Sequence, residues 1–179
     1  MVGLGTSGAA AARALLERNA KVRVTEARDT EELRKQAGEL QALGADVEIG
    51  GHDFRPLDED LAVLSPGIPP NAPVMEALRK SGVPLISEIE LAYHLAECDF
   101  LAITGTNGKT TTTSLLATIL AAAGLPSLAA GNIGLPLVDA VARVGRGGAI
   151  AVEVSSFQLA FIEDFAPKVA AVLNIAEDH

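Results

Sequence analysis

Short apolar runs alternate along the chain with longer stretches in which apolar residues recur every three or four positions. Runs of the first kind predict β-strands, and stretches of the second kind predict amphipathic helices. Because parallel strands need a crossover between them, usually a helix, this alternation predicts a parallel α/β fold. The predicted strands span 21–26, 46–50, 61–65, 84–87, 100–104, 127–131, 148–154 and 168–175, and the predicted helices span 7–19, 29–44, 72–82, 88–98, 110–123 and 135–144.

The alternation of predicted strands and helices divides into two series, with a junction predicted near 87–99. We expect a first domain at 1–87 and a second at 88–179. Both ends look unfinished: two residues precede the first glycine, and the last predicted strand runs into "NIAEDH" without a following helix. We therefore expect a piece of a longer protein, with a clipped first strand and a truncated second domain.

Composition narrows the possible partners. Apolar residues make up 49% of the 179 residues, enough for a substantial core, and the formal net charge is −9. An acidic chain without a basic stripe is not expected to bind nucleic acid. The single cysteine, Cys98, suits a reducing compartment and is expected to be a small buried residue. The longest apolar stretch is broken by Gly124 and Pro126, so we expect a cytoplasmic protein without a membrane span.

Two glycine-rich loops stand between a strand and a helix, and the first opens the chain. Gly3-Leu4-Gly5-Thr6-Ser7-Gly8 fits G-x-G-x-x-G, the loop that brings backbone close to a phosphate in Rossmann-like domains. Glu26 follows the next strand near the place of a dinucleotide-binding acid. Arg28 could instead pair with a phosphate or contact a uracil. A ligand-free turn, with Glu26 and Arg28 as a solvated pair, is the alternative.

The second loop, Gly105-Thr106-Asn107-Gly108-Lys109-Thr110, has the G-x-x-G-K-T core of a phosphate loop. Ile103 occupies the place where the full pattern has its first glycine. Lys109 would reach the β- and γ-phosphates, and the Thr110 hydroxyl could ligate Mg²⁺. A lysine-containing turn without a ligand is the alternative. The context of strand before and helix after predicts binding of a nucleoside triphosphate.

Polar residues follow three further strands. Glu153 ends an apolar run, where it could ligate Mg²⁺ or pair with a buried lysine. Ser155 and Asn132 follow strands at the edge where open α/β sheets bind ligands; each could contact a substrate or shape a turn. His179 could be a second metal ligand or an exposed terminal residue. His52 and His94 are expected in a loop and on a helix face.

Together these segments resemble the Mur ligase family of cell-wall amide ligases. The segments that carry the resemblance are "GLGTSG", "SPGIP", "TGTNGKTTT", "GNIGLP", "EVSSFQL" and "LNIAEDH". The resemblance implies a Rossmann-like N-terminal domain, followed by the first part of a parallel α/β ATP-binding domain of the phosphate-loop type.

The resemblance also implies roles for individual residues. The uridine-diphosphate pocket would be lined by Thr6, Ser7 and Arg28. The ATP phosphates would be held by Gly105, Thr106, Asn107, Gly108, Lys109, Thr110 and Thr111. The muramoyl-alanine substrate would contact Asn132, Ser155 and His179. Mg²⁺ would be ligated by Thr110, Glu153 and His179. Catalysis would rest on Lys109, Glu153 and His179.

The implied reaction joins UDP-N-acetylmuramoyl-L-alanine to D-glutamate. The substrate carboxylate would attack the γ-phosphate of ATP to form an acyl phosphate, which the amine then converts to the amide. The family's carbamylated lysine, adenine-binding stretch and third domain would lie beyond His179, so we expect the 179-residue chain to be inactive alone. We also expect a monomer. A family ligase for another amino acid and a nicotinamide-dependent oxidoreductase are the alternatives.

Overall fold

A computed structural model describes residues 1–52, 59–69 and 71–176 of the chain. It confirms the predicted parallel α/β architecture, since every pair of neighbouring strands runs parallel. No helix in the described residues is long and apolar enough to cross a membrane.

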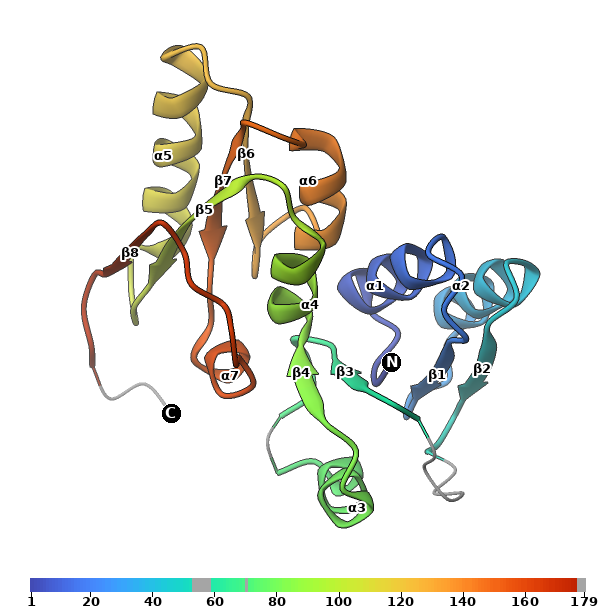
Figure 1. Cartoon of the computed structure of the whole chain (residues 1–179). Helices are drawn as coiled ribbons and strands as arrows, with labels where there is room; N and C mark the ends of the chain where they lie inside the picture. Colours follow the sequence, from blue (N-terminus) through green and yellow to red (C-terminus); the bar gives the residue numbers. More distant parts are fainter. Residues whose placement is uncertain (53–58, 70, 177–179) are drawn as a thin grey trace.

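The first series of elements forms an N-terminal layer around Val2. Its backbone bridges Thr25 on one side and Leu64 on the other, and so joins two strand pairs into the order β2-β1-Val2-β3-β4. Helices α1 and α2 pack beside β1 and β2, whereas α3 lies beside β3 and β4 (Figure 1). The elements are α1 (Thr6–Leu16), β1 (Arg23–Glu26), α2 (Glu31–Ala42), β2 (Asp46–Ile49), β3 (Ala62–Leu64), α3 (Pro73–Ser81) and β4 (Leu85–Ser87).

The second series forms a four-stranded sheet in the order β6-β7-β5-β8. Helix α5 covers one side of this sheet and α6 the other, with α4 next to α6 (Figure 1). The elements are α4 (Glu88–Leu95), β5 (Asp99–Thr104), α5 (Lys109–Ala122), β6 (Ser127–Gly131), α6 (Leu137–Val144), β7 (Ala149–Glu153), α7 (Ser156–Leu159) and β8 (Val169–Val172).

Small residues let the two parts of the chain pack closely. Ala10 and Ala11 of α1 lie in one apolar cluster with Ile89 of α4 and Leu137 of α6. Strand β7 is completely buried, as expected for a central parallel strand covered on both sides. This shared core fixes the carboxyl ends of the second sheet relative to the N-terminal layer.

Most predicted elements are present, with two differences near the carboxyl end of the chain. The short helix α7 was not predicted, because four residues are too few to show a helical period. The strand predicted at 168–175 ends at Val172 instead. Beyond Val172 the N–H of Leu173 still donates to the carbonyl oxygen of Thr104 at 2.9 Å, and the carbonyl oxygen of Asn174 then accepts from the N–H of Thr106 in the second glycine loop at 3.0 Å.

Candidate functional site

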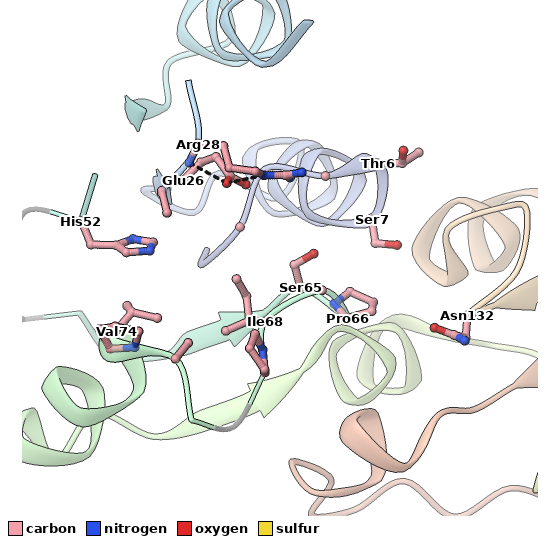
Figure 2. Close-up of a pocket in the computed structure, with 18 of the residues that line it drawn as sticks. Thr6, Ser7, Glu26, Arg28, His52, Ser65, Pro66, Ile68, Val74 and Asn132 are labelled. Atoms are coloured by element: carbon pink, nitrogen blue, oxygen red, sulfur yellow. Dashed lines mark hydrogen bonds and ion pairs between the residues drawn. The ribbon is translucent and has the colours of Figure 1, made fainter. Parts of the chain in front are cut away.

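A cavity of about 710 Å³ opens between the first glycine loop, the 65–74 segment and the loop after β6. Four of the predicted substrate-binding residues line it: Thr6, Ser7, Arg28 and Asn132. Figure 2 shows Ser7 and Asn132 on two sides of one end, with Glu26 and His52 toward the other. The structure thus brings together residues more than 100 positions apart in the sequence.

Close backbone packing shapes the first glycine loop. Gly3 has φ +91°, and a Cβ there would lie 2.8 Å from Cβ of Ser65. A Cβ on Gly8 would collide with the carbonyl oxygen of Gly3. The third glycine therefore lets α1 start directly against the loop, as the sequence pattern predicts.

Glu26 is buried and is bound by the loop itself. Its Oε2 accepts a hydrogen bond from the Leu4 N–H at 2.9 Å, and its Oε1 accepts from the backbone N–H and Nε of Arg28, both at 3.0 Å. Burial raises the pKa of Glu26, but these hydrogen bonds and the Arg28 charge outweigh it, so the pKa lies below its ordinary value. Both carboxylate oxygens already accept protein hydrogens, which weakens the nicotinamide alternative.

The interaction with Glu26 also orients Arg28. The Arg28 side chain is 69% exposed and uses only its Nε toward the carboxylate. Arg28 also lines the cavity, and Figure 2 shows it next to Glu26 at its edge. Instead of the solvated pair of the alternative interpretation, a buried acid holds an exposed cation at the edge of the cavity, where an anionic ligand would meet it.

His52 is a lining residue that sequence reasoning missed. Its Nδ1 lies 2.6 Å from Oγ1 of Thr25, and its ring borders the cavity. The sequence placed it only in a loop, because no local pattern links it to Thr25.

The second glycine loop has the shape of an anion site. Gly105 and Gly108 adopt φ +140° and +86°, and Gly108 precedes α5 without any side-chain cap. The N–H groups of the first turn of α5 can therefore meet an anion. The Lys109 Nζ donates to the carbonyl oxygens of Gly105 at 2.6 Å and Thr106 at 3.0 Å, which holds its charge over the loop.

Glu153 connects this loop to the cavity. Its Oε2 accepts from the Thr110 hydroxyl at 2.7 Å, and its Oε1 accepts from Nδ2 of Asn132 at 3.2 Å. The residue is only 3% exposed. Among the described residues its side-chain partners are a hydroxyl and an amide, not the lysine of the structural alternative. A buried carboxylate without a cationic partner suits a hard metal ion.

Ser155 stands apart from these contacts. Ser155 caps α7: its hydroxyl accepts from the N–H of Gln158, whose side chain returns to the N–H of Ser155. It does not line the cavity described above. His179, with Glu177 and Asp178, lies outside the described residues.

Two buried acids of α4 were not predicted as special. Glu90 accepts hydrogen bonds from the backbone N–H groups of Glu163, Asp164 and Phe165 at 2.9–3.1 Å. Nε2 of His94 lies 3.1 Å from its Oε1. Glu90 therefore anchors the segment after α7 to α4.

The other acid, Glu88, contacts α6. Its Oε1 accepts from the N–H groups of Leu137 and Val138 at 3.1 and 3.4 Å, whereas its Oε2 has no partner among the described residues. Burial raises the pKa of Glu88 to about 7. Glu88 thus fixes the start of the helix that follows the Asn132 loop.

Known protein families account for this arrangement. The profile of the Mur ligase MurD-like N-terminal domain matches residues 1–87, and that of the Mur ligase middle domain matches residues 103–179. The chain belongs to the Mur ligase family. The resemblance seen in the sequence is therefore confirmed for both parts of the chain.

Individual Mur ligases agree with this assignment. The chain is 51% identical over 180 residues to the UDP-N-acetylmuramoylalanine--D-glutamate ligase of Frankia casuarinae, covering 100% of this chain and 38% of that protein. The ligase of the same name from Thermobifida fusca is 46% identical over 183 residues, covering 100% and 39%. This chain thus spans 38–39% of the length of these two relatives.

A solved Mur ligase structure shows the same fold. The UDP-N-acetylmuramate:L-alanyl-gamma-D-glutamyl-meso-diaminopimelate ligase from Neisseria meningitides matches with a TM-score of 0.60 and 26% identity. The match covers 99% of this chain and 60% of that one.

Proposed function

We propose that this chain provides the UDP-substrate site and the ATP-phosphate site of a ligase that adds D-glutamate to UDP-N-acetylmuramoyl-L-alanine. ADP and phosphate would be the other products, and the amide would be a peptidoglycan precursor. The observation that carries the proposal is the row of contacts from Asn132 through Glu153 to Thr110. This row joins a nucleotide-sized cavity to a phosphate loop, as transfer of phosphate to a bound substrate requires. The names of the relatives supply the amino acid.

The two parts of the chain would divide the work. Residues 1–87 would bind the uridine diphosphate, with Thr6, Ser7 and Arg28 around the cavity. Residues 88–179 would bind ATP through the stretch Gly105–Thr111. The loop carrying Asn132 lines the cavity from the second part, so the muramoyl-alanine end would lie at the boundary, nearest to the phosphates.

The chemistry needs a leaving group, because a carboxylate is a poor acylating agent. The substrate carboxylate oxygen attacks the γ-phosphorus of ATP, the bond to the ADP oxygen breaks, and an acyl phosphate forms. The amine of D-glutamate then attacks the carbonyl carbon, loses a proton, and expels phosphate. Lys109 and the amino end of α5 would stabilise the negative charge of the phosphoryl group in transfer.

The structure also fits Mg²⁺ at the same place. Oγ1 of Thr110 and Oε2 of Glu153 lie 2.7 Å apart and would be its oxygen ligands, and Glu153 is buried without a neutralising lysine or arginine among the described residues. When bound, Mg²⁺ would neutralise phosphate charge. Asn132 would keep the Glu153 carboxylate oriented toward Thr110.

Calorimetric titration tests the two sites separately. The 179-residue chain should bind UDP-N-acetylmuramoyl-L-alanine, with UDP as a competitor, and should bind ATP with Mg²⁺. Arg28→Ala should weaken only the binding of UDP-N-acetylmuramoyl-L-alanine, with Arg18→Ala as the matched control. Lys109→Ala should weaken only the binding of ATP with Mg²⁺, with Lys80→Ala as the control. Failure of full-length protein that contains this chain to bind either ligand, or preferential binding of NADH, would overturn the proposal.

Product analysis tests the amino acid. Full-length protein that contains this chain should form the amide with D-glutamate and with no other amino acid offered at the same concentration. A preference for another amino acid would support the alternative family ligase.

A further inference from the structure

Asn174 follows β8 and makes a reciprocal pair of hydrogen bonds with the phosphate loop. The backbone N–H of Asn107 donates to Oδ1 of Asn174 at 2.8 Å, and Nδ2 of Asn174 donates to the carbonyl oxygen of Asn107 at 2.9 Å. A side-chain amide can do this because it carries both an acceptor and a donor. The pair thus holds both backbone polar groups of Asn107, its N–H and its carbonyl oxygen.

The neighbouring backbone reinforces the contact. The N–H of Thr106 donates to the carbonyl oxygen of Asn174 at 3.0 Å, and the N–H of Ala176 donates to Oγ1 of Thr106 at 2.9 Å. Gly105 permits this close approach, since a Cβ there would lie 3.0 Å from the same carbonyl oxygen of Asn174. The segment 174–176 therefore lies directly against the amino-terminal half of the loop.

These contacts change how the loop can bind phosphate. The N–H groups of Thr106 and Asn107 already donate to Asn174, so they do not point at a ligand. The donors that remain for phosphate are those at the start of α5, together with the Lys109 ammonium group. With its first half held from outside, the loop keeps these donors in place before a nucleotide arrives.

We propose that Asn174 is a positioning residue that holds the phosphate loop in its nucleotide-binding shape. The inference rests on the proposed function of the loop, namely binding of ATP phosphates. Asn174 itself is exposed, so its hydrogen bonds add little to global stability. Its effect is expected in the order of the loop and in nucleotide affinity.

Amide hydrogen exchange by NMR tests the contact without any nucleotide. In Asn174→Ala the Asn107 amide should exchange about tenfold faster, because it loses its acceptor. The Thr106 amide should change less, since its acceptor is a backbone carbonyl that the substitution keeps. Unchanged exchange at Asn107 would overturn the inference.

Affinity for Mg²⁺–ATP tests the consequence. Asn174→Ala should weaken binding about tenfold, the value of roughly two ordinary hydrogen bonds, while the melting temperature stays within about 2 °C. Asn174→Asp keeps the acceptor for the Asn107 N–H, but it should weaken binding further, because its carboxylate faces the Asn107 carbonyl oxygen and places a negative charge beside the loop. The difference between these two variants should shrink at high salt.

Asn19→Asp is the matched control, because it makes the same charge change at the exposed turn after α1. It should leave affinity unchanged. If wild type binds ATP and Asn174→Ala binds it equally well, the positioning role is wrong while the proposed function stands. If wild type binds no ATP, the proposed function fails, and the exchange experiment still decides whether Asn174 holds the loop.

Discussion

Replacing Glu88 by glutamine should change how the stability of the chain depends on pH. Glu88 is fully buried, and among the described residues only its Oε1 has partners, the first N–H groups of α6. Burial raises its pKa from 4.5 to about 7. A raised pKa means that the folded state favours the protonated acid. The stabilisation that protonated Glu88 contributes to the folded state is therefore complete below about pH 4.5 and is lost as the pH rises through 7.

The size of the effect follows from the same values. The rise from 4.5 to about 7 corresponds to roughly 3 kcal/mol at about 1.4 kcal/mol per pH unit. Glutamine keeps the acceptor for the N–H groups of α6 but carries no charge to bury. The free energy of unfolding of Glu88→Gln, minus that of wild type, should thus increase by about 2 to 3 kcal/mol between pH 5 and pH 8.

Urea unfolding followed by circular dichroism at several pH values measures this difference. Subtracting wild type removes the titration of all other groups, which both proteins share. Glu39→Gln, at an exposed position of α2, is the control and should give a difference that does not vary with pH. A difference for Glu88→Gln that stays constant within about 0.5 kcal/mol from pH 5 to pH 8 would refute the argument.

Three further predictions concern the site. Gly131→Ala should destabilise the chain clearly more than Gly82→Ala in urea unfolding: both have positive φ, but only a Cβ on Gly131 would collide with the Glu153 carbonyl oxygen. Equal losses would contradict the packing argument. Glu153→Gln should weaken Mg²⁺–ATP binding at least about tenfold and abolish its dependence on Mg²⁺ in calorimetry, because the charged ligand is removed. Retained Mg²⁺ dependence would exclude Glu153 as a ligand. Ser155→Ala should cost about 1 kcal/mol of stability through loss of the α7 cap. A large fall in substrate affinity at unchanged stability would instead support the predicted substrate contact.

The parts of the site that the sequence could predict are those whose structure is determined by neighbouring residues in the chain. Each glycine loop carries its own signal, since strand, loop and helix follow each other within about 20 residues. The division into strands and helices followed from apolar periodicity for the same reason. Glu153 could be singled out because an acid at the end of an apolar run is costly without a partner.

The residues that sequence reasoning missed have distant partners. Glu88 and Glu90 lie in the first turn of α4, where acids are common because of the helix dipole. Nothing local shows that Glu88 meets α6 or that Glu90 binds a segment more than 70 residues away. The polar contacts of Asn174 with the phosphate loop were likewise invisible, because they depend on which strand lies beside β5.

The order of the strands explains why Asn132, Glu153 and Thr110 lie next to one another across the sheet. In the order β6-β7-β5-β8, Glu153 at the end of β7 lies between the loop after β6 and the loop after β5. The register places it opposite both Gly131 and Ile103. It can therefore reach Asn132 on one side and Thr110 on the other without any change in backbone conformation.

The remaining neighbour of β5 is β8, which delivers Asn174 to the far side of the phosphate loop. The loop is thus held from both sides, by Glu153 through Thr110 and by Asn174 through Asn107. The N–H groups of Thr106 and Asn107 are taken by Asn174, whereas the donors at the start of α5 and the Lys109 ammonium group remain for a ligand. Since each partner comes from a different strand end, a parallel sheet with β5 between β7 and β8 is what makes this site possible, and no single segment could form it alone.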